Sequence, residues 1–592
     1  MLHVYDNMSI LRLQHRPFSL LAVALFAVGL LPTSAVAQDL AGHQKLDTAL
    51  DEVVHHPGGT APTRRVIIQA APGARALIRQ TLVASGHHIQ SDLNLINGLA
   101  VDLSPAELEA LTHNPKIASL SSDAAVRATQ ASSPTSGGTN DTVPLRDTLG
   151  LTDLSPQGRG VGVAIIDSGI RASSQFEDRI AAFFDFTHGG VATAPYDDYG
   201  HGTHVAGLIG GSGEEASQYR GVAPNVRLIG LKVLDSNGAG TTSAVIAALE
   251  FAIANRTQLG IDVINLSLGH GILESASTDP LVQAVEQAVR AGIVVVTAAG
   301  NFGTNPQTAL VGYGGITSPG NAPSAITVGA EDLSGTVVRS DDRVPAYSSR
   351  GPSWYDGYAK PDLVAPGHRL PSVAAPGSSL YQLLATKYPA NLIYTSEDTA
   401  SYMVLSGTSM ATAVTSGVVA TLLDASRTAN PGTALTPNAI KAILEFTALP
   451  LSDGSGVPYD ALTQGTGALN AAGAITLARS VNPSLPAGTW WLVAGVAPST
   501  TIGGQVMPWA QNIVWGTNIV WGTSVVVNQP AWAQNIVWGT NIVWGTNIVW
   551  GTNIVWGTNI VWGTNIVWGT NIVWGTNIVW GTNIVWGTVL PL

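Results

Sequence analysis

From residue 158 onward the sequence alternates short apolar runs with longer helical patterns, and this alternation constrains the fold more than any other feature. Uninterrupted runs of Val, Ile, Leu and Ala predict strands that are buried on both faces. Strands that alternate with helices imply a parallel sheet covered on both faces, because parallel strands need a crossover connection. The predicted strands are Val161–Ile166, Val226–Val233, Val263–Leu268, Ile293–Ala298 and Ala325–Val328, and predicted helices include Thr242–Asn255 and Pro280–Ala291.

Polar residues stand at the ends of several predicted strands. Asp167, Ser267 and Asn301 each lie at such an end. Open α/β sheets bind their ligands outside the carboxyl ends of the strands. We therefore expect the chemistry of this protein at that edge.

Three short motifs supply the residues of a Ser-His-Asp hydrolase triad. They are Ile-Ile-Asp-Ser-Gly around Asp167, Gly-His-Gly-Thr-His-Val-Ala-Gly around His201, and Ser-Gly-Thr-Ser-Met-Ala around Ser409. A serine hydroxyl is a weak nucleophile, and it needs a base and a third group that orients the base. The chain order Asp, His, Ser distinguishes one class of these enzymes from the two other common orders.

On these motifs the chain resembles the subtilisin-like serine peptidases (subtilases), and the resemblance covers most of residues 150–480. It implies an α/β fold with a mostly parallel sheet, and an endopeptidase that forms an acyl-enzyme. Ser409 would be the nucleophile, His201 the general base and then acid, and Asp167 the group that orients His201.

The resemblance also assigns the groups that bind substrate. Asn301 and the backbone amide of Ser409, which opens a predicted helix, would form the oxyanion hole. Ser267, Leu268 and Gly269 would pair with the substrate backbone. Ala298, Ala299 and Gly300 would form one wall of the first specificity pocket.

Other chemistries fit the sequence less well. His201 and His204 lack the glutamate and the four-residue spacing of a zinc-peptidase helix. Gly158, Gly160 and Gly162 precede a strand and do not open a helix, which excludes the dinucleotide motif. We expect no cofactor for the chemistry and no metal at the site. Structural calcium is possible by resemblance, with no site assigned, and we expect Asp197 and Asp198 in a solvated loop.

The net charge and the composition of the chain indicate which classes of partner to expect. The 592-residue chain has 27 Lys and Arg residues against 39 Asp and Glu, a net charge of −12, which argues against binding of nucleic acid. It has no cysteine, so disulfides are excluded. Protein or peptide substrates are the expected partners.

The N-terminal region predicts export and a regulatory domain. Arg12 and Arg16 precede an apolar run and the small residues Ala35-Val36-Ala37, so residues 1–37 are a predicted signal peptide of a secreted, extracellular protein. After a linker at 38–62, residues 63–127 predict a β-α-β-β-α-β unit. It has a capping box at Ser104 and a hairpin turn at Asn97-Gly98.

In its position this small α+β, ferredoxin-like unit resembles the inhibitory propeptide of subtilases, although the pattern alone fits an unrelated α+β domain equally well. The remaining predicted segments are a flexible linker and activation region at 128–144, the catalytic domain at 145–480, a linker at 481–511 and a repeat tail at 512–592.

The tail repeats Asn-Ile-Val-Trp-Gly-Thr, and the chain has no charged residue after Arg479. Alternation predicts a strand in each Asn-Ile-Val-Trp with Gly-Thr as a turn, in a solenoid or in stacked hairpins. So apolar a repeat would promote self-association or attachment to the cell surface, and it fits equally an expansion without function. A rival hypothesis is therefore a surface adhesion protein whose protease domain only processes itself.

Overall fold

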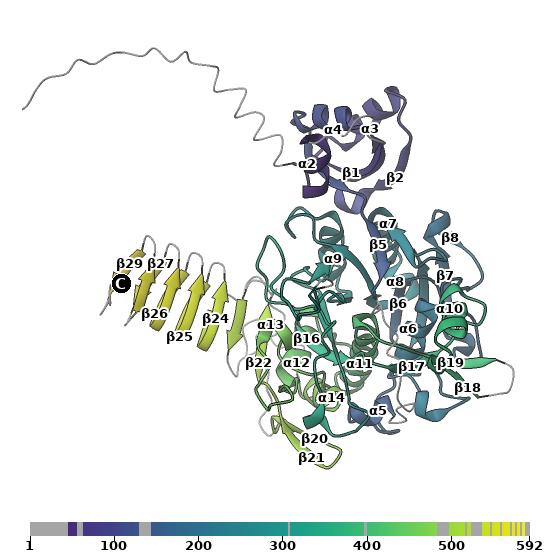
Figure 1. Cartoon of the computed structure of the whole chain (residues 1–592), viewed down its shortest axis with the longest axis vertical. Helices are drawn as coiled ribbons and strands as arrows, with labels where there is room; N and C mark the ends of the chain where they lie inside the picture. Colours follow the sequence, from purple (N-terminus) through teal and green to yellow (C-terminus); the bar gives the residue numbers. More distant parts are fainter. Residues whose placement is uncertain are drawn as a thin grey trace, which may run out of the picture.

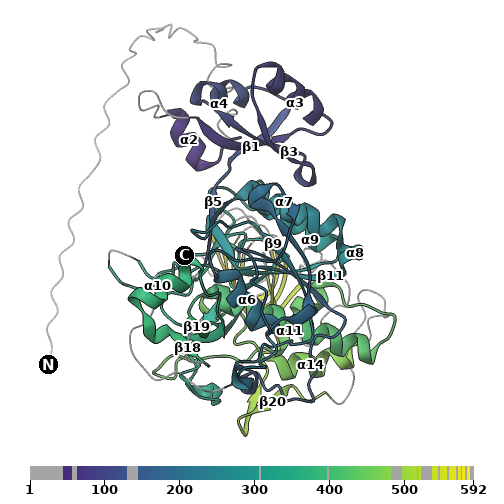
Figure 2. The ribbon, with the colours of Figure 1, turned by 90° about the vertical axis from the view of Figure 1, so that its right-hand side faces the viewer.

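The computed structural model describes residues 45–55, 63–129, 144–305, 308–395, 399–481 and 496–511, and the backbone of short strands between 512 and 586. An N-terminal domain (residues 45–129) lies over a larger main domain (residues 144–511), and the strands of the tail form a ladder to one side (Figures 1 and 2). The predicted signal peptide and most of the predicted activation region lie outside the described residues. None of the described helices is long and apolar enough to cross a membrane.

The main domain is built on an eight-stranded sheet with the order β16-β15-β13-β11-β6-β9-β7-β8. All neighbouring strands are parallel except the β7–β8 pair at one edge. The strands are β6 Gly162–Asp167, β7 Ile180–Asp185, β8 Val191–Ala192, β9 Arg227–Lys232, β11 Ile261–Leu266, β13 Val294–Ala298, β15 Ile326–Glu331 and β16 Leu363–Pro366.

Both faces of this sheet are apolar, and helices cover both. In β6, Val163 and Ile165 join the apolar cluster beneath helices α6 and α11, whereas Ala164 and Ile166 join the cluster beneath α7 and α9. The prediction of a mostly parallel sheet with helices on both faces is therefore confirmed. The helices are α6 His201–Gly210, α7 Thr242–Ala254, α9 Pro280–Arg290, α11 Thr408–Ala429, α12 Pro437–Thr447 and α14 Ala471–Ser480.

Shorter elements complete the main domain and connect the sheet to the helices. The short strands are β10 Ala239–Thr241, β12 Leu268–Gly271, β14 Thr317–Ser318, β17 Leu370–Val373, β18 Leu392–Tyr394 and β19 Ala400–Leu405. The short helices are α5 Leu145–Thr148, α8 Arg256–Leu259, α10 Ser379–Lys387 and α13 Ala461–Gln464.

The N-terminal domain has the predicted element order. Its antiparallel sheet runs β2-β3-β1-β4, and Ser104 and Glu107 form the predicted capping box. The elements are β1 Arg64–Ala70, α3 Arg75–Ala84, β2 Ile89–Leu93, β3 Gly98–Leu103, α4 Pro105–Thr112 and β4 Ile117–Ser122.

One face of this antiparallel sheet packs on the main domain. Ile67, Leu93, Ile96 and Ala100 belong to the same apolar cluster as the buried residues of α7 and α9. The carboxylate of Asp123 accepts hydrogen bonds from the backbone N–H of Ser243, at 2.7 Å, and from its hydroxyl, at 2.7 Å, at the start of α7. The N-terminal domain is thus docked by both apolar and polar contacts.

Part of the predicted linker 38–62 is a helix instead. Helix α2 (Thr48–His55) buries Leu50 against the N-terminal sheet, and the backbone N–H of Thr48 donates to the carbonyl of Leu273 in the main domain at 3.1 Å. The mixed polar sequence concealed the helix because only one of its side chains is fully buried.

The predicted linker 481–511 is also wrong over its second half. A hairpin of β20 (Ser499–Ile502) and β21 (Gln505–Pro508) closes the main domain, with Ile502 and Trp509 buried in its core. The Trp509 ring packs edge-on against Phe446 at 6.3 Å, and its Nε1–H donates to the hydroxyl of Thr500 at 2.7 Å. The main domain therefore ends near residue 511 and not at 480.

The described strands of the repeat tail pair in two ways. β22 (Asn512–Trp515) and β23 (Asn518–Trp521) pair antiparallel, and the later strands form a parallel ladder. The choice between a solenoid and stacked hairpins stays a prediction. Gly-Thr is not always a turn, because β25 runs through Gly551 and Thr552 without a break. The ladder strands are β24 Ile536–Trp544, β25 Asn547–Trp556, β26 Asn559–Trp568, β27 Asn571–Trp574, β28 Asn577–Trp580 and β29 Asn583–Trp586.

Replacement of the buried Trp509 should destabilise the main domain. Trp509→Ala opens a cavity against Phe446, and such truncations cost about 3–5 kcal/mol. Urea unfolding of the variant, in a Ser409→Ala background that prevents self-digestion, should show a clearly lower midpoint. Trp354→Ala, at a side chain that is 63% exposed, is the matched control and should change the midpoint little. Equal midpoints for the two variants would contradict the placement of this hairpin in the core.

Candidate active site

Asp167 and His201 meet at the carboxyl edge of the sheet. Asp167 is the last residue of β6, and His201 is the first residue of α6. His201 Nδ1 lies 2.8 Å and 3.0 Å from the two carboxylate oxygens of Asp167. An ionised carboxylate only accepts hydrogen bonds, so Nδ1 carries the proton and Nε2 is left as the acceptor. Nε2 is buried and has no hydrogen-bond partner among the described residues.

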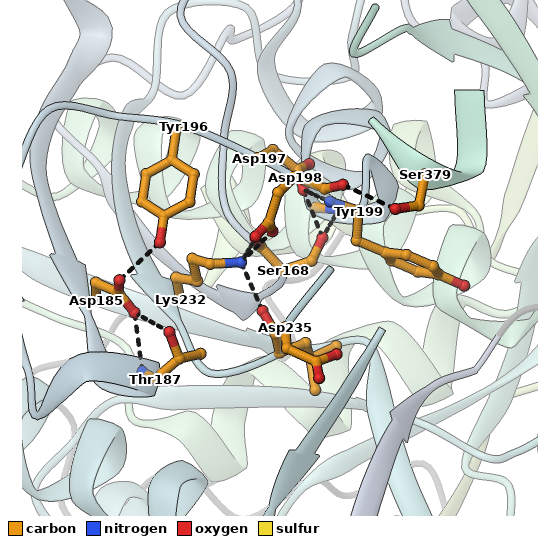
Figure 3. Close-up of polar contacts among 12 residues, drawn as sticks. Ser168, Asp185, Thr187, Tyr196, Asp197, Asp198, Tyr199, Lys232, Asp235 and Ser379 are labelled. Carbon is orange, nitrogen blue, oxygen red and sulfur yellow. Dashed lines mark hydrogen bonds and ion pairs between the residues drawn. The ribbon is translucent and has the colours of Figure 1, made fainter. Parts of the chain in front are cut away.

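The segment before His201 is fixed by Asp197, which is not in the solvated loop that the sequence predicted. Asp197 is 7% exposed, and its carboxylate accepts from the N–H groups of Gly200, at 2.7 Å, and Thr203, at 2.8 Å. These are N–H groups at the start of α6, which have no partner within the helix. Ser168, which follows Asp167, donates its hydroxyl to the same carboxylate at 2.9 Å (Figure 3).

Ser409 lies in the first turn of α11 and contacts the end of the N-terminal domain. Its hydroxyl oxygen is 2.7 Å from the carbonyl oxygen of Thr129 and 3.0 Å from that of Ser267. Its backbone N–H donates to the Thr129 carbonyl at 3.3 Å. No hydrogen bond joins Ser409 to His201 in this arrangement of the described residues, in which both side chains are fully buried.

Residues before Thr129 form a strand between β10 and β12, and we call the space between these two strands the cleft. β5 (Ala125–Ala128) pairs antiparallel with β10 on one side and with β12 on the other, with Leu268 opposite Ala128 and Gly269 opposite Arg127. The N–H of Thr129 donates to the carbonyl of Ser267 at 3.2 Å. The segment Ser267–Gly269 thus contacts an extended segment of the protein itself, and its pairing with substrate stays a prediction.

The side-chain amide of Asn301 is hydrogen-bonded through its oxygen and not through its nitrogen among the described residues. Its Oδ1 accepts from the backbone N–H of Thr408 at 3.0 Å, which fixes the orientation of the amide. Its Nδ2 is buried without a hydrogen-bond partner among the described residues. Two N–H donors of Asn301 are therefore available beside the residue that precedes Ser409.

Ala298, Ala299 and Gly300 lie at the end of β13, beside the same helix start. The Gly300 N–H donates to the Thr408 hydroxyl at 3.2 Å. Gly300 has a φ of +106°, and a Cβ there would lie 2.8 Å from Thr317. No described contact joins these three residues to Thr129, so their role as a pocket wall stays a prediction.

His204 is a structural residue. It is fully buried, and its Nε2 donates to the carbonyls of Leu370, at 3.0 Å, and Met403, at 3.1 Å. Burial, together with the neighbouring imidazole of His201, lowers the pKa of His204 to about 3, which keeps it neutral. No group of three or more His, Asp or Glu side chains in the described part of the chain is arranged to hold a metal ion. Calcium therefore stays a prediction without a site.

Several site residues were missed by the sequence analysis. Thr129 and the end of β5 fell partly in the predicted flexible segment 128–144, although Ala125–Ala128 has the alternation of a short strand. β10 was missed because it is only three residues long and contains Gly240. Asp197 stands four residues before His201, outside the N-cap position held by Gly200, so the usual capping pattern gives no signal for it.

The sequence of this chain is similar to those of known serine peptidases. The model of the family described as "Subtilase family" matches residues 158–474. The chain is 42% identical over 294 residues to the serine protease AprX of Bacillus subtilis (strain 168), a match that spans 49% of this chain and 61% of AprX. It is 37% identical over 267 residues to subtilisin DY of Bacillus licheniformis, across 45% of this chain and 78% of that protein.

Two further similarities extend over more of the chain. The extracellular serine proteinase of Thermus sp. (strain Rt41A) is 34% identical over 383 residues, which span 62% of this chain and 78% of the relative. The crystal structure of fervidolysin from Fervidobacterium pennivorans, a keratinolytic enzyme related to subtilisin, has a TM-score of 0.53 at 21% identity. That match covers 71% of this chain and 61% of fervidolysin. At this identity it is a likeness of fold.

Proposed function

This chain is a member of the subtilase family of serine endopeptidases, and from that premise we propose that it is a secreted enzyme that first cuts its own chain after Thr129. The observation that carries the proposal is the position of the Thr129 carbonyl, which lies against both the hydroxyl and the backbone N–H of Ser409. The scissile bond would be Thr129–Gln130, and β5 would occupy the cleft as a substrate strand does.

The proposed mechanism assigns one step to each side chain. Ser409 attacks the carbonyl carbon of Thr129, and Nε2 of His201 takes the hydroxyl proton. Asp167 holds the tautomer that leaves Nε2 free and stabilises the imidazolium that forms. The backbone N–H of Ser409 and the amide of Asn301 stabilise the negative oxygen.

The tetrahedral intermediate then breaks down in two stages. His201 gives its proton to the departing amine of Gln130, and Thr129 is left as an ester on Ser409. Water, activated by His201, hydrolyses that ester and restores the serine. The same steps would act on other protein chains once the cleft is vacated.

Contacts of β5 support a substrate preference. Backbone pairing with β10 and β12 accepts an extended chain of almost any sequence. Val126 is fully buried in the apolar cluster that holds Leu234 and Leu268, whereas Arg127 is exposed. We propose that the enzyme prefers an aliphatic residue three positions before the cleaved residue.

The proposal also includes secretion of the protein and inhibition of the enzyme by its own N-terminal domain. The basic and apolar pattern of residues 12–37 supports secretion, and one similar protein is named an extracellular serine proteinase. The docked N-terminal domain, with β5 in the cleft, supports its role as an inhibitory propeptide.

Loss of the nucleophile should block processing. Ser409→Ala should accumulate as an uncut chain, whereas the wild-type product should begin at Gln130, as intact-mass and N-terminal analysis would show. A Ser409→Ala chain that matures normally would refute the assigned triad.

Asn301→Ala should still cut itself, but its kcat should fall by about 10²–10³-fold with little change in KM. This is the effect of losing the same kind of donor in subtilisin itself.

Inhibition should depend on residues that precede the predicted unit 63–127. A segment of residues 45–129 retains α2, the bonds of Thr48 to Leu273 and the terminal Thr129. We expect it to inhibit the mature enzyme about tenfold more tightly than residues 63–129, since two hydrogen bonds to the main domain are restored. Thr48→Ala in the longer segment removes only the hydroxyl bond and keeps the backbone bond, so it should lose about half of this difference in binding free energy. Equal inhibition constants would show that α2 makes no contribution.

Inhibition should also weaken as pH rises. Burial, with the charges of Asp279 and Asp47, raises the pKa of Glu274 from 4.5 to about 8 in the docked state. Docking contributes to this shift by covering the carboxyl and by bringing Asp47 near it, whereas Asp279 is present without docking. Docking therefore favours the protonated carboxyl and weakens as pH rises toward about 8. The inhibition constant of segment 45–129 should rise by at most about tenfold per pH unit in that window. Glu274→Gln should flatten this profile, and an unchanged profile would contradict the coupling.

We also propose that the tail joins two copies of the chain. Each ladder pair matches residues of the same type one double repeat apart, such as Ile536 with Ile548 and Asn571 with Asn583. β29 pairs only with β27 among the described strands, and a strand from a second tail has the same residues in the same order. Such an edge can be extended by an identical chain.

Removal of the tail should change association and leave catalysis intact. Truncation after Gln511 keeps the hairpin of β20 and β21, and it removes no ionisable side chain. Casein turnover per active site should equal that of the full mature chain. In sedimentation velocity, the full Ser409→Ala chain should form larger species as its concentration rises, and the truncated chain should not. A full chain that stays monomeric would rule out joining through the tail.

A further inference from the structure

Lys232 is a buried cation beside the proposed triad. It is the last residue of β9 and only 1% exposed. Its Nζ donates to the carbonyl oxygens of Ser168, at 2.7 Å, and Leu234, at 2.6 Å, and to Oδ1 of Asp198 at 2.5 Å. An ammonium group has three N–H donors, so all three are used. The ring of Tyr196 lies 5.1 Å from the nitrogen and offers its face to the charge (Figure 3).

The three oxygen atoms come from segments that carry or support the triad. Ser168 directly follows Asp167, and Asp198 stands three residues before His201. Leu234 belongs to the chain that leaves β9, where the N–H groups of Val233 and Leu234 donate to the backbone carbonyl of Asp167 at 2.8 Å and 3.2 Å. One ammonium group thus ties together the two loops that hold Asp167 and His201.

These loops also touch at their backbones, so a shift in one is passed to the other. A Cβ on Gly169 would lie 2.1 Å from the carbonyl of Tyr196, and a Cβ on Gly202 would lie 2.1 Å from the carbonyl of Gly169. Asp197 fixes the start of α6, whereas the next carboxylate, Asp198, is bound by Lys232. Tyr196 is anchored in turn by its hydroxyl, which donates to Asp185 at 2.7 Å.

We propose that Lys232 is a positioning residue that acts as an internal cation and sets the distance between Asp167 and His201. The inference rests on the proposed triad. Without the ammonium, two carbonyl dipoles and the Asp198 carboxylate would face one another with no donor between them. Their repulsion would move the 196–200 segment, and with it His201, away from Asp167.

The test is Lys232→Met, which keeps a long unbranched apolar side chain and removes only the ammonium. A misplacement of about 1 Å in such a site costs about 10²-fold in rate, so we expect kcat to fall by about 10- to 100-fold while KM changes less than about twofold. Self-cleavage at Thr129 in the intact chain, a single turnover without substrate binding, should slow by the same factor.

Lys360→Met is the matched control at another buried lysine. Its Nζ donates to Asp362 at 2.8 Å and to the carbonyl of Ala325 at 3.2 Å, neither of which is in the site. This variant should lose stability to urea, but its kcat per active site, counted with a fluorophosphonate titrant, should be unchanged. If Lys232→Met keeps its kcat, or loses no more than Lys360→Met, the proposal is overturned.

Asp198→Asn provides a second, milder variant that is independent of whether Lys232→Met folds. It should lower kcat with little change in KM, and the double variant should lose no more activity than Lys232→Met alone, since both changes break one ion pair. Losses that simply multiply, or an unchanged kcat in Asp198→Asn, would overturn the proposal. Failure of the triad itself is distinguished separately, because only then would Ser409→Ala remain active.

Discussion

The parallel pairing of β6 with β9 places Asp167 opposite Lys232 at one edge of the central sheet, and the geometry of the site depends on this register. Because every strand from β16 to β7 runs in the same direction, their carboxyl ends share that edge. The edge therefore collects Asp167 from β6, Ser267 after β11 and Asn301 after β13. Helices α6 and α11 then bring His201 and Ser409 to it, each within a first helical turn. Residues distant in sequence become neighbours because apolar burial on both faces holds the sheet in place.

The same edge explains how the N-terminal domain can lie in the cleft. β10 and β12 are not paired with each other, and each presents backbone groups that β5 satisfies. An extended chain that enters there gains main-chain hydrogen bonds whatever its side chains are. The glycines on both sides, Gly240 and Gly269, have no room for a Cβ, which would lie 2.3 Å and 2.7 Å from neighbouring carbonyl oxygens. Close backbone packing thus shapes the cleft before any side chain selects a substrate.

Much of this arrangement could be predicted from the sequence, and the failures have physical causes. The sheet and its two helical layers followed from uniform apolar runs, since such runs are buried on both faces. The long strands were therefore found, whereas β7 and β16, with mixed or short patterns, were not. Asp167, His201, Asn301 and Ser409 were selected as candidates because their motifs are specific. Asp197 and Lys232 were not, because a buried charge next to its partner has the same sequence pattern as an exposed one. Helix α2 and the closing hairpin were taken for linkers because each buries only one or two large apolar side chains.

On the proposed function, a cut after Thr129 would not by itself open the cleft. Among the described residues, the contacts of the docked domain lie before residue 130, and they include β5 in the cleft, Asp123 on α7, Thr48 on Leu273 and the apolar face around Ile67. Cleavage would convert a tethered strand into a bound product, and only the advantage of the tether would be lost. Release would then require the docked face to separate, or the domain to be digested by another molecule. The timing of activation would thus be set by the interface on α7 and α9 rather than by the chemistry at Ser409. Because Glu274 lies at that interface and not in the site, conditions that weaken docking could act without any change in the catalytic residues.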